Sequence, residues 1–137
     1  MQDKCFLDTN ILLYIVSNDD KKFIAKDLIK SRHTISIQVL NEFSNVSVRK
    51  LKFTTDETKE FIEAISSKVI VEGYTKITIF SALDLKSKYN LQFYDALIIA
   101  TAVENNCTIL YSEDMQDGLV INNTITIKNP FVHNDIK

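Results

Sequence analysis

Two short apolar runs of this chain end in residues that could bind a cation. The run Lys4–Leu7 leads into Asp8, and the run Cys107–Tyr111 leads into Ser112 and Asp114. In an open α/β sheet, ligands bind beyond the carboxyl ends of the strands. If the two runs are neighbouring strands, Asp8 and Asp114 therefore share one edge of the sheet.

Two further acids lie within apolar helical patterns and have no cationic neighbour there. None of the residues three or four positions away from Glu42 or from Asp95 is Lys or Arg. Neither acid therefore has an ion-pair partner on its own predicted helix.

The segment from Thr108 to Ile127 contains no Lys or Arg, although Glu113, Asp114 and Asp117 crowd into five of its residues. Ionised carboxylates in apolar surroundings are costly, because burial and like-charge repulsion both disfavour the charged form. A hard divalent cation would neutralise them. Mg²⁺ or Mn²⁺ prefers oxygen ligands, keeps several waters and leaves room for phosphate oxygens.

Zinc fits this chain less well than magnesium or manganese. The residues that zinc prefers are His33, His133, Cys5 and Cys107, and they show no ligand spacing. Both cysteines lie in apolar runs, where a small buried hydrophobic side chain is the simpler interpretation.

Taken alone, each candidate has an ordinary structural explanation. Asp8 could be a helix N-cap, Asp95 a first-turn acid favoured by the helix dipole, and Glu42 a solvated residue at the border of a helix face. Ser112 and Asp117 could be turn residues. The metal-site hypothesis therefore depends on the whole set.

The acids need a scaffold, and the apolar pattern predicts short strands that alternate with helices. This alternation favours a parallel sheet of about five strands with helices on both faces, which is a three-layer α/β/α sandwich. The predicted strands are Lys4–Leu7, Thr34–Ile37, Val69–Val71, Cys107–Tyr111 and Thr124–Lys128. The predicted helices are Asn10–Val16, Asp19–Ser31, one opened by Ser36 or Gln38, one opened by Thr55, and those near Lys76–Lys88 and Phe93–Asn105.

Length and composition exclude several classes of protein. A chain of 137 residues is expected to form a single domain, residues 1–137, with a frayed tail at about 131–137. Gly73 and Gly118 are the only glycines, so neither a dinucleotide-binding glycine loop nor a P-loop can exist.

The charge balance and the lengths of the apolar runs indicate which partners and which cellular location to expect. Sixteen Lys and Arg against eighteen Asp and Glu give a net charge of −2, so no overall basic field attracts a polyanion. The longest apolar stretches, Ile11–Val16 and Ala96–Val103, are shorter than the ~20 residues of a membrane span. With no secretory signal at the amino terminus, we expect a cytoplasmic protein without a membrane partner.

Four segments of the chain, in order, resemble the acidic motifs of PIN-domain ribonucleases, in particular the VapC toxins of bacterial type II toxin–antitoxin systems. These segments are Phe6–Leu12, the mid-chain Glu42, Phe93–Ile98 and Tyr111–Gly118. The resemblance implies a PIN-like fold and an endoribonuclease, dependent on Mg²⁺ or Mn²⁺, that leaves 5′-phosphate and 3′-hydroxyl ends. It also implies a homodimer and a cognate antitoxin protein that holds the toxin inactive.

The resemblance further implies a role for each candidate residue. Asp8 and Asp95 would be the main metal ligands, and Glu42 and Asp114 would complete the acidic pocket directly or through water. Asn10 and Ser112 would support the pocket. Asp117 would match an extra acid found in some members. The chain departs from many nucleases in being slightly acidic overall.

Two other functions remain open from the sequence. One is a phosphatase with Asp8 as its nucleophile, although such enzymes carry a second Asp where this chain has Asn10. The other is a non-catalytic, receiver-like module whose acidic rim binds Mg²⁺ without hydrolysis.

Overall fold

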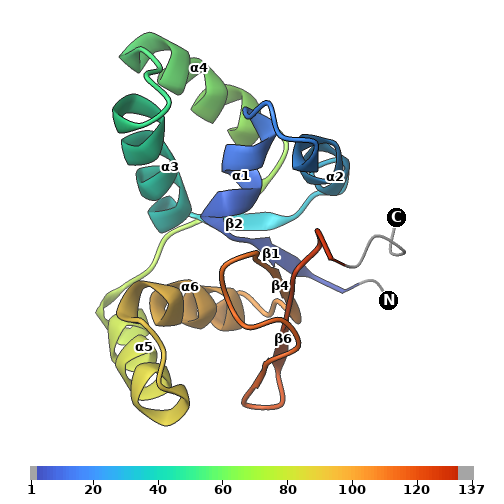
Figure 1. The fold of residues 1–137 in the computed structure, drawn as a ribbon. Coiled ribbons are helices and arrows are strands. Elements are labelled where there is room, and N and C mark those ends of the chain that lie inside the picture. Colours follow the sequence, from blue (N-terminus) through green and yellow to red (C-terminus); the bar gives the residue numbers. More distant parts are fainter. Residues whose placement is uncertain (1–2, 133–137) are drawn as a thin grey trace.

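The computed structural model describes residues 3–132, in which six helices surround a six-stranded sheet (Figure 1). The strands are β1 (Cys5–Leu7), β2 (Thr34–Ser36), β3 (Ile70–Glu72), β4 (Ile109–Tyr111), β5 (Val120–Ile121) and β6 (Ile125–Lys128). The helices are α1 (Thr9–Ile15), α2 (Lys21–Leu28), α3 (Ile37–Arg49), α4 (Thr55–Ser66), α5 (Lys76–Tyr89) and α6 (Phe93–Glu104).

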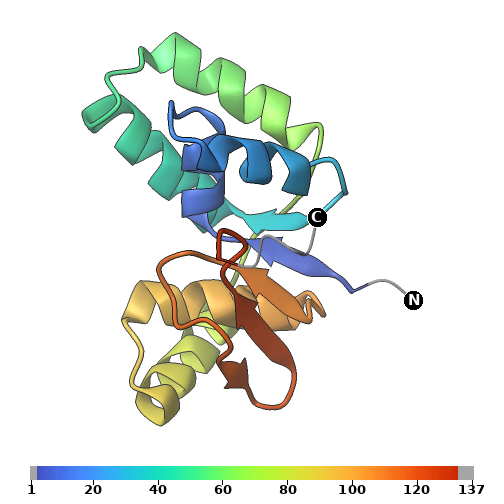
Figure 2. The same cartoon turned by 45° about the vertical axis from the view of Figure 1, so that its right-hand side comes forward.

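The strands follow the order β3-β2-β1-β4-β6-β5, and all pairs are parallel except β5 with β6. Figures 1 and 2 show α1 to α4 grouped together on one side of β1, with α5 and α6 paired on the other. The predicted α/β class with a mainly parallel sheet is confirmed.

The centre of the fold is formed by β1, β4 and α6. Phe6, Leu7 and Leu110 are fully buried in the two strands. Every residue of α6 from Ala96 to Ala102 is buried, because this helix is apolar on nearly every side. The first turn of α6, which carries Asp95, is therefore held by a rigid element.

The sequence prediction missed β5 and its antiparallel pairing. Asn122 and Asn123 both have positive φ, at 52° and 54°, and they join β5 to β6 in a hairpin. Asn tolerates the left-handed conformation that such turns need, so the turn forms without glycine. The predicted strand Thr124–Lys128 is otherwise present as β6.

The sequence prediction placed Phe131 in a frayed tail, which is wrong for this residue. Phe131 is buried and its ring packs edge-on against Tyr14, with 4.9 Å between centroids. Residues 133–137, including His133, lie outside the described residues. Among the helices described, none is long and apolar enough to cross a membrane.

Candidate functional site

The register of the two central strands places the strand-end residues side by side. Leu7 of β1 lies opposite Tyr111 of β4, so the next residues, Asp8 and Ser112, leave the sheet together. The Asp8 backbone N–H donates to the Tyr111 carbonyl at 3.0 Å, and the Ser112 hydroxyl donates to Asp8 Oδ2 at 2.7 Å. Parallel pairing thus brings together two segments that lie about a hundred residues apart.

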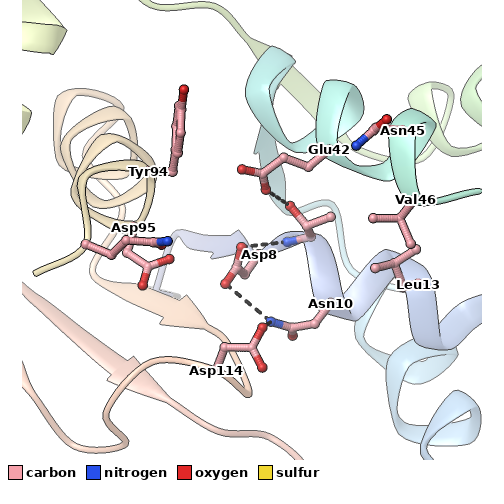
Figure 3. A pocket seen from close by; sticks show the side chains of 11 residues that line it. Asp8, Asn10, Leu13, Glu42, Asn45, Val46, Tyr94, Asp95 and Asp114 are labelled. Carbon is pink, nitrogen blue, oxygen red and sulfur yellow. Dashed lines mark hydrogen bonds between the residues drawn. The ribbon is translucent and has the colours of Figure 1, made fainter. Parts of the chain in front are cut away.

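A pocket of about 320 Å³ opens at this edge of the sheet, and its wall brings together all four predicted acids (Figure 3). No Lys, Arg or His belongs to this wall within the part of the chain that the structure describes. The lining residues are Asp8, Thr9, Asn10, Leu13, Glu42, Asn45, Val46, Gln92, Tyr94, Asp95 and Asp114.

Asp8 is both a helix cap and a wall of this pocket. Its Oδ1 accepts the Thr9 backbone N–H at 2.7 Å, which caps α1. Its Oδ2 accepts from Ser112 and, at 3.3 Å, from Asn10 Nδ2. The capping explanation and the proposed ligand role therefore do not exclude each other.

Burial raises the pKa of Asp8 to about 6, and the charges of Asp95 and Glu42 act in the same direction. The hydrogen bonds from Ser112 and Thr9 oppose this rise. Burial also raises the pKa of Asp95, with further contributions from Asp114 and Glu42. The four carboxylates thus share one negative field, which a cation would relieve.

Glu42 is held by two donors that the sequence analysis missed. Thr9 Oγ1 donates to Glu42 Oε1 at 2.5 Å, and Gln38 Nε2 donates to Glu42 Oε2 at 3.0 Å. Gln38 Nε2 also donates to the Tyr94 carbonyl at 3.1 Å, so it links α3 to the start of α6. Gln38 could have been found from its position four residues before Glu42 on one helix, but Thr9 gave no such signal.

Asn10 connects the two strand-end acids. Its Nδ2 lies 3.3 Å from Asp8 Oδ2 and 3.4 Å from Asp114 Oδ2, and its Oδ1 accepts the Glu113 backbone N–H at 3.2 Å. Ser112 is fully buried and bridges Asp8 to the Met115 backbone N–H. Both residues therefore hold the acids in place.

Two acids of the 108–127 segment do not face the pocket. Glu113 accepts hydrogen bonds from Lys21 Nζ and from the Tyr14 hydroxyl, so the predicted lack of compensation is wrong for this residue. Burial acts to raise the pKa of Glu113, but the bonds from Lys21 and Tyr14 lower it overall. Asp117 accepts the Asn129 backbone N–H at 2.8 Å and is absent from the pocket wall described above.

The donor set fits a hard divalent cation. Within residues 3–132, no three His, Cys, Asp or Glu side chains form a metal site in their present positions. The wall nevertheless supplies carboxylate, amide and hydroxyl oxygens, which Mg²⁺ and Mn²⁺ prefer. No Lys, Arg or His of the wall described by the structure offers these oxygens a positive charge.

The chain is similar to one protein family and to several solved structures. The family model of the PIN domain matches residues 5–116, whereas no curated protein matches the sequence. VapC20 of Mycobacterium tuberculosis, a sarcin-ricin loop cleaving toxin, has 19% identity and a TM-score of 0.68, over 81% of this chain and 90% of that one.

Two solved complexes contain a similar chain. A toxin–antitoxin complex from Klebsiella pneumoniae has 20% identity and a TM-score of 0.72, over 93% of this chain and 98% of that one. VapBC2 from Rickettsia felis, bound to a DNA fragment from its promoter, has 21% identity and a TM-score of 0.68, over 91% and 97%. At these identities the shared property is the fold.

Proposed function

The chain belongs to the PIN domain family, and from this premise we propose that it is a Mg²⁺- or Mn²⁺-dependent endoribonuclease, the toxin of a type II toxin–antitoxin pair. The observation that carries the proposal is the pocket in which Asp8, Glu42, Asp95 and Asp114 converge. Hydrolysis of an RNA phosphodiester would leave 5′-phosphate and 3′-hydroxyl ends. We also propose that residues 1–137 form one nuclease domain.

The proposed roles follow from the contacts of each side chain. Asp8 and Asp95 would hold the metal, because both carboxylates line the pocket beside two further acids and no cation of the described wall neutralises them. When bound, a divalent metal supplies charge stabilisation at the scissile phosphate and a lower pKa for the attacking water. Glu42 and Asp114 would complete the ligand set.

The supporting residues orient these acids. Ser112 and Asn10 donate to the same Asp8 oxygen, and Asn10 also reaches Asp114. Asp117 lies outside the described pocket wall, and its carboxylate accepts the Asn129 backbone N–H.

The partners in the proposal are an RNA substrate, a cognate antitoxin protein and a second copy of the chain. The support for an antitoxin is that two structures of similar fold are described as a toxin–antitoxin complex and as VapBC2. RNA as substrate is supported by the sarcin-ricin loop cleavage named for the Mycobacterium tuberculosis toxin.

The enzyme proposal is tested by RNA cleavage. Purified wild type with Mn²⁺ should cut total cellular RNA at discrete positions, which sequencing of new 5′ ends would locate. EDTA or Asp95→Asn should remove these cuts, because each removes metal from the pocket. Asp84→Asn, at an exposed acid of α5 outside the pocket wall, is the matched control and should cut normally.

Two outcomes would contradict the enzyme proposal. Cuts that persist in EDTA would mean that no metal is needed. An absence of cuts from a folded protein that binds Mn²⁺ would favour the non-catalytic, Mg²⁺-binding module.

The toxin role is tested separately by growth. Induced expression of the wild type alone in a bacterial host should arrest growth, and Asp95→Asn at the same expression level should not. The physical reason is that a free endoribonuclease destroys RNA that the cell needs. Normal growth with confirmed wild-type expression would argue against a toxin, even if cleavage in vitro holds.

A further inference from the structure

Tyr94 is a large aromatic side chain that lines the acidic pocket yet is 59% exposed. It lies in the first turn of α6, directly before Asp95. Figure 3 shows Tyr94 and Asp95 on the α6 side of the pocket, with Glu42 and Asn45 on the α3 side. No hydrogen bond of the Tyr94 hydroxyl is found within residues 3–132, so this hydroxyl pairs with no other polar group in that part of the fold.

The backbone of Tyr94 is held in place, and its ring has one aromatic neighbour. The Tyr94 carbonyl accepts from Gln38 Nε2, and Gln38 is buried at 4% exposure. The Tyr94 ring also packs edge-on against Phe93, with 5.4 Å between centroids and 70° between planes. An exposed aromatic face beside this pocket is suited to stacking, because a Tyr side chain has only two rotatable bonds to order when a flat ligand binds.

The pocket wall lacks the groups that usually bind a phosphate backbone. Proteins obtain most of their nonspecific affinity for nucleic acids from Lys and Arg, and neither residue type belongs to this wall as the structure describes it. Stacking on aromatic side chains is the main alternative source of affinity for single-stranded RNA. Asn45 and Gln92 line the same pocket, and a side-chain amide can hydrogen-bond the edge of a base.

We propose that Tyr94 is the stacking platform for a nucleobase next to the scissile phosphate, with Asn45 and Gln92 as the groups available to its edge. A volume of about 320 Å³ is at the lower end of the roughly 300–1,000 Å³ of ligand pockets, which suits one nucleotide of a single strand. This inference rests on the proposed ribonuclease function, and it names a nucleobase as the part of the RNA that Tyr94 contacts.

The first experiment uses tryptophan fluorescence. The chain contains no Trp, so Tyr94→Trp introduces a single indole beside the pocket. In the Asp8→Asn background, chosen because it is expected to slow cleavage strongly, titration with an adenosine RNA hexamer should quench this emission to saturation. A ribose-phosphate hexamer without bases and inorganic phosphate should not quench it.

The matched control is Phe80→Trp in the same background. Phe80 lies on α5, outside the pocket wall, and is 56% exposed, close to the value for Tyr94. Its indole should not respond to the hexamer. Equal quenching at both positions, or equal quenching by the hexamer without bases, would overturn the stacking proposal.

The second experiment is steady-state cleavage by the active enzyme. Tyr94→Ala should raise KM for RNA by between about 5-fold and about 150-fold, whereas Tyr94→Phe keeps the aromatic face and should retain the wild-type KM. An unchanged KM in a folded Tyr94→Ala protein would overturn the inference and leave the nuclease proposal standing. If wild type cuts no RNA but the Tyr94→Trp titration saturates, Tyr94 binds a base without cleavage, and the nuclease proposal fails together with the placement of that base beside a scissile phosphate. Should Tyr94→Ala not fold, the titration alone decides.

Discussion

The Asp8→Asn variant is expected to cleave RNA at least about 100-fold more slowly than the wild type and yet to unfold at a higher temperature. The loss of activity is large because even the mutation of a residue that only supports a metal ligand lowers activity or metal affinity by about 10- to 100-fold. Asp8 is only 5% exposed, and burial together with Asp95 and Glu42 raises its pKa to about 6. Its charge therefore opposes folding in the metal-free protein. A neutral amide of the same shape removes that opposition.

The raised pKa of Asp8 also predicts how the stability of the wild type changes with pH. The pKa of Asp8 in the folded protein is above its ordinary value of 3.8, so the folded state binds the proton more tightly than the unfolded chain does. Stability from this group is full below pH 4 and falls as the pH rises through 6, by roughly 3 kcal/mol in total. Asp8→Asn should lose this part of the pH dependence.

The gain in the free energy of unfolding should stay below roughly 3 kcal/mol, because the new amide accepts fewer hydrogen bonds from its neighbours than the carboxylate does. Asp8 Oδ2 accepts from both Ser112 and Asn10, and an Asn side chain has only one acceptor oxygen. Thermal unfolding between pH 4 and pH 8, with Asp84→Asn as the control for an exposed acid, measures the effect. Full cleavage by Asp8→Asn would refute the site, and an unaltered pH profile of stability would refute the argument from burial.

Divalent metal should stabilise the wild type strongly and the Asp8→Asn variant weakly. A ligand that binds only the folded state adds about 2.7 kcal/mol when its concentration is 100 times its Kd. Mg²⁺ and Mn²⁺ would do so here because they neutralise carboxylates that have no cation in the pocket wall described by the structure. The same metal should restore the cleavage that EDTA removes.

This stabilisation should also depend on pH. Protons compete with metal for Asp8, whose pKa is about 6, so the shift in Tm should be larger at pH 7.5 than at pH 5.5. Thermal unfolding with and without Mn²⁺, together with calorimetric titration at both pH values, measures it. Asp84→Asn should respond like the wild type. An equal shift in Asp8→Asn would place the metal elsewhere.

The fold class and the positions of the acids in it were predictable from the sequence. Alternating short apolar runs and helical patterns predicted the parallel sheet, because the burial of each element is recorded in its own periodicity. Asp8 and Asp114 follow strands directly, so the topology of a parallel sheet was enough to bring them to one edge. Glu42 and Asp95 stood out because a carboxylate in an apolar helical pattern without a cation is costly wherever that helix lies.

The hydrogen-bond and ion-pair partners of these acids were not predictable from the sequence. Glu113 looks uncompensated in sequence, yet it is paired with Lys21, which lies 92 positions away. Thr9 and Gln38 donate to Glu42, and Asp117 accepts the backbone N–H of Asn129. Likewise, Tyr94 became part of the pocket wall only through the placement of α6. Periodicity reports how each element is buried, but a side chain's partner depends on how distant elements are placed, and no local pattern records that placement.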